Sequence, residues 1–171
     1  FEVYRGETLG LVGESGCGKT TLGRTILKLI EATSGDVDFN GKSLMIFSGK
    51  SLREIRRKIQ VVFQDPYSSL NPRITAGHII REPMDIHRKS LTREEKRLRT
   101  SDLLRQVGLS ESDADRYPHE FSGGQRQRIG IARALASEPE FIILDEAVSA
   151  LDVSVQAQIL NLLNELKESY S

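Results

Sequence analysis

Tryptophan is absent from the sequence of 171 residues, and there is a single cysteine. One cysteine, Cys17, excludes an internal disulfide and is compatible with a reducing compartment. Neither sign of charge is in excess, because 24 lysine and arginine residues balance 24 aspartate and glutamate residues. A net charge of zero gives no bulk attraction to nucleic acid or to an anionic membrane, so we expect no nucleic-acid partner.

Long apolar runs are also missing, so the sequence predicts no membrane-spanning helix, and no signal peptide opens it. We find no internal repeat and no low-complexity segment. The length is enough for one domain with a sizeable core. Both ends look cut, because Phe1–Tyr4 is predicted to be a strand and a helix starting near Val153 still runs at the last residue. We therefore expect a fragment of a longer protein.

One segment fits the phosphate-binding P-loop pattern G-x-x-x-x-G-K-[ST]. It consists of Gly13, Glu14, Ser15, Gly16, Cys17, Gly18, Lys19 and Thr20. Residues 8–12 before it are predicted to form a short buried strand, and Thr21–Ile30 after it a helix with an apolar stripe. A flexible turn that happens to contain Lys-Thr is the alternative. The order of strand, glycine loop and helix favours the P-loop.

The glycines of this loop explain how it would bind phosphate. Gly13, Gly16 and Gly18 can take backbone angles closed to other residues and carry no side chain. Inward N–H groups then form a nest for anionic oxygens, and the helix start adds its positive dipole end. That dipole contributes only about 0.3–1 kcal/mol when exposed, whereas a full charge about 4 Å away contributes about 4 kcal/mol. We therefore expect Lys19 to attract the β- and γ-phosphates most strongly and Thr20 to offer its hydroxyl to Mg²⁺.

Between residues 36 and 63 the sequence predicts a strand, a helix and a second strand. Asp36–Asn40 is predicted to be a short strand turning at Asn40–Gly41, and Ile59–Phe63 a buried strand. Ser51–Lys58 between them is predicted to be a helix capped by Ser51. Its basic residues are interpreted as a solvated face, with a phosphate or partner contact as the alternative. They are Arg56, Arg57 and Lys58.

The middle of the chain is helical, with no strand signal between residues 63 and 141. Its first helix has an apolar face and a break or kink at Pro83. That face consists of Ile79, Ile80 and Met84. A charged helix at Thr92–Val107 has a buried side made of Leu98, Leu103, Leu104 and Val107. Ser110–Arg116 is a short polar turn of helix. We divide the chain into a first core part at 1–72, a helical subdomain at 73–118, and a second core part at 119–171.

Two acidic residues end the apolar strand predicted at Phe141–Glu146. A carboxylate at the carboxyl end of a strand beside a P-loop can hold Mg²⁺, which we assign to Asp145. Glu146 then stands where it can polarise an attacking water. Two acids capping a strand in solvent are the alternative. Gln64, at the end of the earlier buried strand, sits where ligands bind in α/β folds, although an ordinary strand end is the preferred reading of its position alone.

A second glycine-rich helix start begins at Ser122. Ser122 can cap the helix that follows, while Gly123 and Gly124 leave its N–H groups bare. This gives a second candidate anion site, about a hundred residues from the P-loop. A plain serine cap with a flexible entry is the alternative. The final helix is predicted to follow Asp152, a good N-cap residue.

Five segments, in this order, resemble the Walker A, Q-loop, signature, Walker B and D-loop motifs of ABC-type ATPases. They are Gly13–Thr20, Gln64, Phe121–Gln125, Phe141–Glu146 and Ser149–Asp152. The resemblance covers essentially the whole chain. Gln64–Arg73 and Tyr117–Gln125 further resemble the oligopeptide/dipeptide (peptide/nickel) importer branch of that family.

The resemblance implies an α/β fold: a P-loop NTPase (RecA-like) core with a mostly parallel sheet, a partial antiparallel portion and a helical insertion. It implies ATP with Mg²⁺, bound by the P-loop and Thr21. Two ATP-binding domains, identical or paralogous, would pair head to tail. The signature of one would then meet the P-loop of the other. That signature consists of Ser122, Gly123, Gly124 and Gln125.

The resemblance also assigns the remaining site residues. Gln64 would reach Mg²⁺ and the attacking water and report to transmembrane permease subunits, which the helical insertion would face. Asp152 would run along the dimer interface. The subunit would work at the cytoplasmic face of the membrane. No arginine is obviously placed as a finger, so a helix start from the partner could supply the missing positive potential.

The sequence departs from the family at Ala147, where proline is usual, which makes the position of Glu146 less certain. The adenine-stacking aromatic and the switch histidine of the family lie outside this chain. The leading hypothesis is an ATP-hydrolysing subunit of a peptide importer. The competing hypotheses are an ABC-type ATPase acting on DNA or ribosomes, and a nucleotide-binding switch without turnover.

Overall fold

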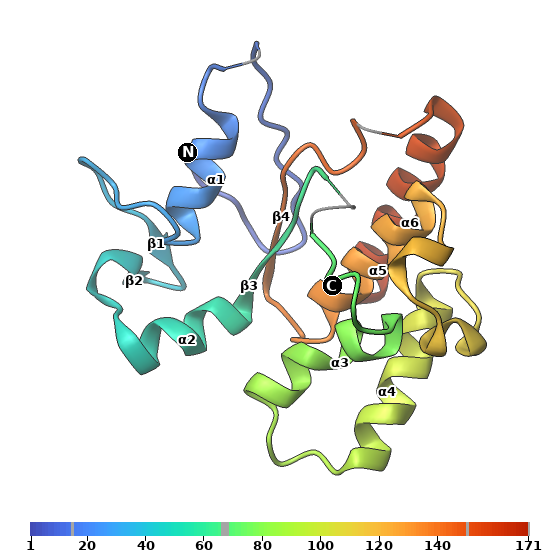
Figure 1. Ribbon diagram of the computed structural model, residues 1–171. Coiled ribbons are helices and arrows are strands. Elements are labelled where there is room, and N and C mark those ends of the chain that lie inside the picture. Colours follow the sequence, from blue (N-terminus) through green and yellow to red (C-terminus); the bar gives the residue numbers. More distant parts are fainter. Residues whose placement is uncertain (15, 66–68, 150, 171) are drawn as a thin grey trace.

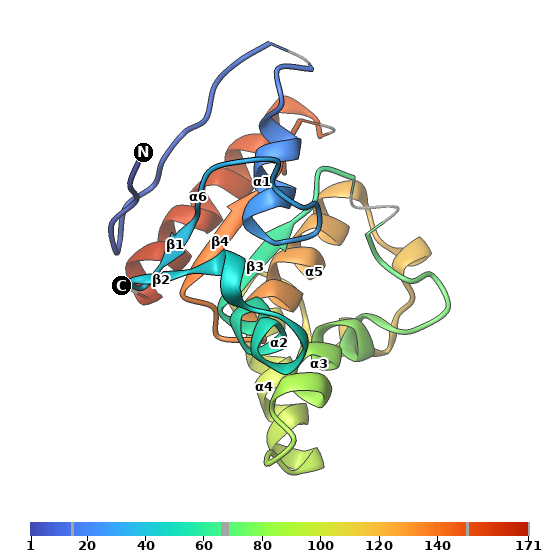
Figure 2. The same cartoon turned by 90° about the vertical axis from the view of Figure 1, so that its left-hand side faces the viewer.

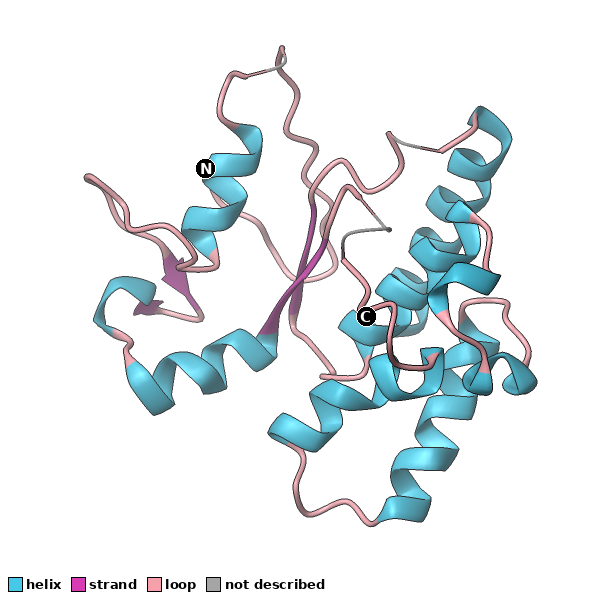
Figure 3. Cartoon of the chain, in the orientation of Figure 1, coloured by secondary structure: helices cyan, strands magenta, loops and turns pink. Residues whose placement is uncertain are grey.

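The computed structural model describes residues 1–14, 16–65, 69–149 and 151–170. In chain order the α-helices are α1 (Lys19–Ile26), α2 (Gly49–Lys58), α3 (Ala76–His87), α4 (Arg93–Gln106), α5 (Gly123–Leu135) and α6 (Val153–Tyr170). The strands are β1 (Asp38–Phe39), β2 (Lys42–Ser43), β3 (Ile59–Val62) and β4 (Phe141–Leu144). Short 3-10 helices lie at Leu44–Ile46, Glu111–Asp115 and Pro118–Glu120. Figure 1 shows α1 on one side of the β3–β4 pair and α5 on the other, and Figure 3 shows how far helices outweigh strands.

The parallel pair β3–β4 is the centre of the fold. It runs in register from Ile59 opposite Phe141 to Val62 opposite Leu144. Asp145 continues the ladder by donating its N–H to the Val62 carbonyl at 3.0 Å. The two predicted strands are thus confirmed, although each is shorter than predicted. Because parallel strands end at the same edge, the residues that follow them are brought together there.

The predicted hairpin turn at Asn40–Gly41 is confirmed. β1 and β2 pair antiparallel, with Phe39 opposite Lys42. Both turn residues have positive φ, 53° at Asn40 and 74° at Gly41. This combination favours Asn-Gly in two-residue hairpins, which is the signal the sequence carries.

The predicted strands at Phe1–Tyr4 and at residues 8–12 are wrong. Neither segment is a strand, and Val12 is 94% exposed. Figure 2 shows the segment running as a long loop along the outside of the molecule. Within the described ranges no strand pairs with it, so its apolar side chains have neither ladder bonds nor a covering layer. The helix predicted at Thr21–Ile30 is shifted, since α1 spans Lys19–Ile26.

Helical packing builds the larger of the two apolar cores. Most predicted core residues are buried there, namely Ile79, Ile80, Met84, Leu103, Leu104 and Val107. Leu98 is the error, because it is 54% exposed. Six residues separate it from Leu104, so the two side chains point about 120° apart around the helix axis. α3 continues through Pro83, so of the predicted break or kink the break is wrong and the kink stays a prediction.

Side chains mark where the helices start. Thr92 caps α4 in a capping box with Glu95, and Ser110 caps the 3-10 helix at Glu111–Asp115. The cap predicted at Ser51 is wrong. α2 begins at Gly49 with Ser48 as its N-cap, and the Ser51 hydroxyl accepts the Ser48 N–H at 3.2 Å. The serine spacing allows both registers, and the structure adopts the earlier one.

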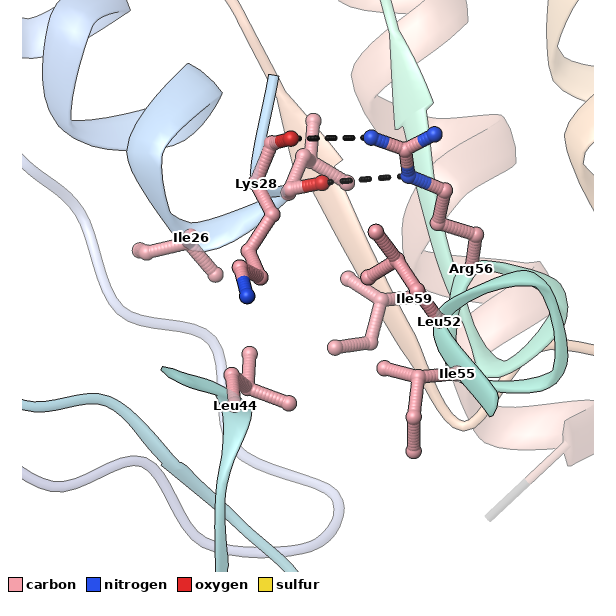
Figure 4. Close-up of a pocket in the computed structure, with 8 residues that line it drawn as sticks. Ile26, Lys28, Leu44, Leu52, Ile55, Arg56 and Ile59 are labelled. Carbon is pink, nitrogen blue, oxygen red and sulfur yellow. Dashed lines mark hydrogen bonds between the residues drawn. The ribbon is translucent and has the colours of Figure 1, made fainter. Parts of the chain in front are cut away.

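The basic end of α2 is structural and not simply a solvated face. Arg56 donates to the Lys28 carbonyl at 2.8 Å and to the Leu27 carbonyl at 3.4 Å (Figure 4). These carbonyls follow the last turn of α1, which lacks intrahelical donors for them. Lys58 pairs with Glu140 at 2.6 Å. The cavity drawn in Figure 4 is only about 10 Å³ and mainly apolar, so it holds no ligand.

The helical part is tied together by charge as well. Lys96 of α4 donates to Asp85 of α3 at 2.9 Å, and Arg81 donates to the same carboxylate at 3.2 Å. The hydrogen bond from Lys96 is the main cause that lowers the pKa of Asp85. None of the helices in the described ranges combines the length and apolarity that a bilayer crossing requires.

Two leucines of α4 give a test of the core. Leu104→Ala should lower the free energy of unfolding by about 2–5 kcal/mol, because it leaves a cavity at a fully buried position. Leu98→Ala is the control on the same helix and should change it by less than about 0.5 kcal/mol. Urea denaturation followed by circular dichroism measures both. Equal losses would contradict the packing of α4 described here.

Candidate functional site

The glycine loop before α1 has the backbone that the P-loop pattern predicts. Gly16 and Gly18 have positive φ, 81° and 99°, and Gly18 is the N-cap of α1. A Cβ on Gly13 would lie 2.6 Å from the Cys17 sulfur, so glycine there leaves room for the Cys17 side chain in this position. Ser15, also predicted to bind nucleotide, lies outside the described residues. All three predicted glycines therefore serve the shape of the loop, for two different physical reasons.

The Lys19 side chain folds back over this loop. Its ammonium donates to the Gly13 and Glu14 carbonyls, both at 2.8 Å, and lies 3.8 Å from Glu146 Oε1. The side chain of Lys19 is 20% exposed. A cation held by loop carbonyls close to the N-terminus of α1 is placed for an anionic ligand.

Thr20 joins the loop to the end of β4. Its hydroxyl donates to Asp145 Oδ1 at 2.8 Å across 125 residues of sequence. Asp145 is half-buried, so this contact is partly shielded from water. Hydroxyl and carboxylate oxygens are ligands that Mg²⁺ prefers, and Mg²⁺ commonly uses one carboxylate together with substrate phosphates. These two oxygens fit such a cation, although the described residues contain no cluster of three or more metal-binding side chains.

Glu146 and Gln64 meet at the carboxyl edge of the two strands. Gln64 Nε2 donates to Glu146 Oε2 at 2.9 Å and to the Ser149 hydroxyl at 3.2 Å. Glu146 has a φ of 46°, in the left-handed region. A proline at 147 would disfavour that conformation in the residue before it, whereas Ala147 leaves it accessible. The buried Ala147 thus bears directly on where the Glu146 carboxylate points.

The second glycine-rich helix start is formed as predicted at Ser122. The Ser122 hydroxyl accepts the Gln125 N–H at 3.3 Å, and Gln125 Oε1 accepts the Ser122 N–H at 3.0 Å. Ser122 is exposed. Gly124 has a further reason to be glycine, because a Cβ there would lie 2.5 Å from a methyl group of Val155. A Cβ on Gly123 would lie 3.3 Å from Leu151, so these glycines let the start of α5 lie close to α6 and to the turn before it.

The structure brings some predicted site residues together and leaves others apart. One group surrounds the P-loop and the strand ends, namely Lys19, Thr20, Gln64, Asp145 and Glu146. The Ser122 helix start belongs to α5, which lies on the opposite side of the β3–β4 pair from α1 (Figure 1). Thr21 and Asp152 are exposed, at the start of α1 and just before α6. The two glycine-lined helix starts therefore do not face one another within this chain.

Sequence reasoning gave no role to Arg133, and it named Ser149 only as part of the D-loop segment. Arg133 of α5 donates to the Ser69 carbonyl at 2.7 Å. Burial lowers the pKa of the Arg133 guanidinium, and the charge of Glu82 opposes that shift. The available signal was an arginine among the apolar residues of the second half of α5, Ile129–Leu135. Ser149, which accepts from Gln64, had no signal beyond its place after the acids.

The sequence of this chain is similar to that of known proteins. A family model described as ABC transporter matches residues 1–149. An oligopeptide transport ATP-binding protein, OppF of Bacillus subtilis, is 61% identical over 169 residues, which are 98% of this chain and 55% of that protein. A glutathione import ATP-binding protein, GsiA of Pectobacterium atrosepticum, is 55% identical over 170 residues, 99% of this chain and 27% of that protein. The chain thus spans about half the length of OppF and less of GsiA.

Solved structures agree with the arrangement. The protein cbiO1 of Clostridium perfringens, described as part of the ABC transporter complex cbiONQ, superposes with a TM-score of 0.88 at 30% identity, covering 99% of this chain and 66% of that chain. The ATP-binding cassette MJ0796, solved as a post-hydrolysis dimer bound to ADP and phosphate, superposes with a TM-score of 0.85 at 34% identity. This superposition covers 99% of this chain and 73% of the MJ0796 chain.

The contact between α5 and α6 can be tested at Gly124. Gly124→Ala should lower the free energy of unfolding by about 1–3 kcal/mol, because its new methyl group overlaps Val155. Adding Val155→Ala should restore most of the loss. Gly130→Ala is the matched control on α5, since its Cβ meets nothing within 4 Å, and should raise stability by about 0.5–1 kcal/mol. Denaturant unfolding measures all three, and a neutral Gly124→Ala would refute the contact.

Proposed function

This chain belongs to the ABC transporter family of ATP-binding proteins, and on that premise we propose that it binds and hydrolyses ATP within a peptide importer. The observation that carries the proposal is the convergence of the P-loop with the strand-end acids. Lys19 lies 3.8 Å from Glu146, and Thr20 donates to Asp145 at 2.8 Å. Peptides are supported as the cargo because OppF is an oligopeptide transport ATP-binding protein. Because the chain spans only part of them, the complete protein is the unit to which this function is assigned.

The proposed ATP site uses the loop as a phosphate cradle. The free N–H groups at the start of α1 would face the phosphates, and Lys19 would provide the full positive charge beside the β- and γ-phosphates. Mg²⁺, when bound, would neutralise charge that develops on the transferred phosphoryl group. Thr20 Oγ1 and the Asp145 carboxylate are the residues that would hold it, with Gln64 approaching from the next strand.

Glu146 is the proposed general base for the attacking water. Its carboxylate lies at the strand edge beside the loop cation and is exposed enough to contact a water molecule. Gln64 would orient that water from the neighbouring strand. General base catalysis needs an acceptor within hydrogen-bond reach of the water, and a carboxylate one residue after the cation ligand meets that need.

We further propose that two such domains pair head to tail, either as identical chains or as paralogues. The α5 start lies across the strand pair from the P-loop, so a second copy is the natural source of a helix N-terminus for the same phosphate. Its contacts would come from Ser122, Gly123, Gly124 and Gln125. Asp152, exposed before α6, would lie along the interface. The dimeric form of the solved relative MJ0796 supports pairing.

The proposed division of the chain follows its elements. Residues 1–72 and 119–171 form the two parts of the core, and residues 73–118 form the helical subdomain. That subdomain and the Q-loop at Gln64 would face transmembrane permease subunits, and the protein would work at the cytoplasmic face of the membrane. Support comes from cbiO1, whose description makes it part of a transporter complex. Nucleic acid is not a proposed partner.

The nucleotide site is tested by Lys19→Ala. Removing the charge that the loop holds at its mouth should abolish measurable ATP binding, since it supplies the strongest single attraction for phosphate. Isothermal titration calorimetry of the full-length protein measures this. Lys50→Ala, at an exposed position on α2, is the control and should bind as the unaltered protein does. Unchanged affinity in Lys19→Ala would refute the assignment.

Turnover is tested separately by Glu146→Gln. The amide keeps the shape of the side chain but cannot accept a proton, so ATP should still bind while hydrolysis falls by about 100-fold or more. The variant should accumulate as a closed dimer with ATP. Phosphate release and size-exclusion chromatography of the full-length protein measure the two effects. Normal hydrolysis would remove Glu146 from the base role.

A further inference from the structure

The side-chain amide nitrogen of Gln64 donates to two acceptors, and both lie in the same turn of the backbone. Its Nε2 donates to Glu146 Oε2 at 2.9 Å and to Ser149 Oγ at 3.2 Å. A primary amide nitrogen has two protons, so these two bonds use its full donor capacity. Both acceptors belong to the turn after β4, while Gln64 follows β3.

The donors and acceptors around this amide determine its orientation. The Ser149 hydroxyl donates its only proton to the Glu146 carbonyl at 3.0 Å, so it meets Gln64 as an acceptor. The Glu146 carboxylate is likewise an acceptor when ionised. A flipped amide would direct Oε1 at both acceptors and gain no donor in return. Gln64 Oε1 must therefore point away from Glu146 and Ser149.

Ser149 also fixes the turn on which Glu146 stands. Its backbone N–H donates to the same Glu146 carbonyl at 3.0 Å. Glu146 has a left-handed φ of 46°, an uncommon conformation for a residue with a side chain. Two bonds from Ser149 to this one carbonyl thus stabilise the turn that aims the carboxylate. The serine side chain makes one contact with each of the two proposed reaction residues.

The geometry points to Ser149 as a positioning residue that sets the direction of the Gln64 carbonyl oxygen and the aim of the Glu146 carboxylate. The inference rests on the proposed function, because Oε1 is the only side-chain atom of Gln64 that can ligate a cation while Nε2 carries two protons. Without the hydroxyl, one N–H of the amide loses its acceptor and the amide can rotate about its remaining bond to Glu146. The proposed Mg²⁺ site then loses a pre-oriented oxygen.

Three variants of the full-length protein test this inference. Ser149→Ala should raise the Mg²⁺ concentration for half-maximal ATP turnover and lower kcat, each by about 3- to 10-fold, the change expected for one hydrogen bond. Ser149→Thr keeps the hydroxyl and should restore both values. Ser169→Ala is the matched control, because Ser169 also donates to the carbonyl three residues earlier, at Leu166, but on α6. It should behave as the unaltered protein does.

A double-mutant cycle separates positioning from a general structural effect. In a Gln64→Ala background, Ser149→Ala should raise the Mg²⁺ requirement no further, because its partner is already gone. Full additivity of that effect, failure of Ser149→Thr to rescue, or no effect of Ser149→Ala would overturn the inference.

A second readout does not depend on turnover. In ¹⁵N-labelled protein, the two side-chain amide protons of Gln64 should have separate, shifted resonances that move towards free-amide values in Ser149→Ala. Resonances that stay in place would overturn the inference even in a protein that hydrolyses ATP. Absence of hydrolysis in the unaltered protein, with the resonances moving as expected, would refute the proposed function and leave Ser149 as the residue that orients the amide.

Discussion

The site depends on one hydrogen bond, from the Thr20 hydroxyl to the Asp145 carboxylate. α1 has no buried residue of its own, so apolar packing alone does not fix its position. The helix is held at its start by this bond and at its end by Arg56, which caps the carbonyls of Leu27 and Lys28. Because Asp145 continues the parallel ladder from β4, the bond ties the glycine loop to the most regular part of the fold.

That arrangement supports the proposal that one chain supplies half of an ATP site. The loop cation, the hydroxyl and the acids gather at one edge of the strand pair, while the second glycine-lined helix start lies on the other side (Figure 1). Its serine is exposed, so its helix N-terminus can be offered to another molecule. The proposed head-to-tail pair would therefore couple hydrolysis to assembly, because positive potential reaches the phosphate only when two domains close.

The family resemblance implied the α/β fold with its helical insertion, whereas local patterns predicted the Asn40–Gly41 turn and the Ser122 cap. These depend on residues within a few positions of one another. The failures needed long-range information. Residues 8–12 have the composition of a strand, but no described strand pairs with them, so Val12 is exposed. Arg56 was predicted to be solvated because its partners, the carbonyls that follow α1, are distant in the sequence. The contact of Ser149 with Gln64 exists only because the ends of β3 and β4 lie together, and no sequence spacing predicts it.

The most direct measurement is a crystal structure of the full-length protein with Mg²⁺ and a non-hydrolysable ATP analogue. The account predicts that the γ-phosphate contacts the Lys19 ammonium, that Mg²⁺ lies beside Thr20 and Asp145, and that Ser122 of a second copy approaches the same phosphate. A triphosphate bound away from the loop at Gly13–Thr20, or one with Asp145 turned away from the cation, would contradict it.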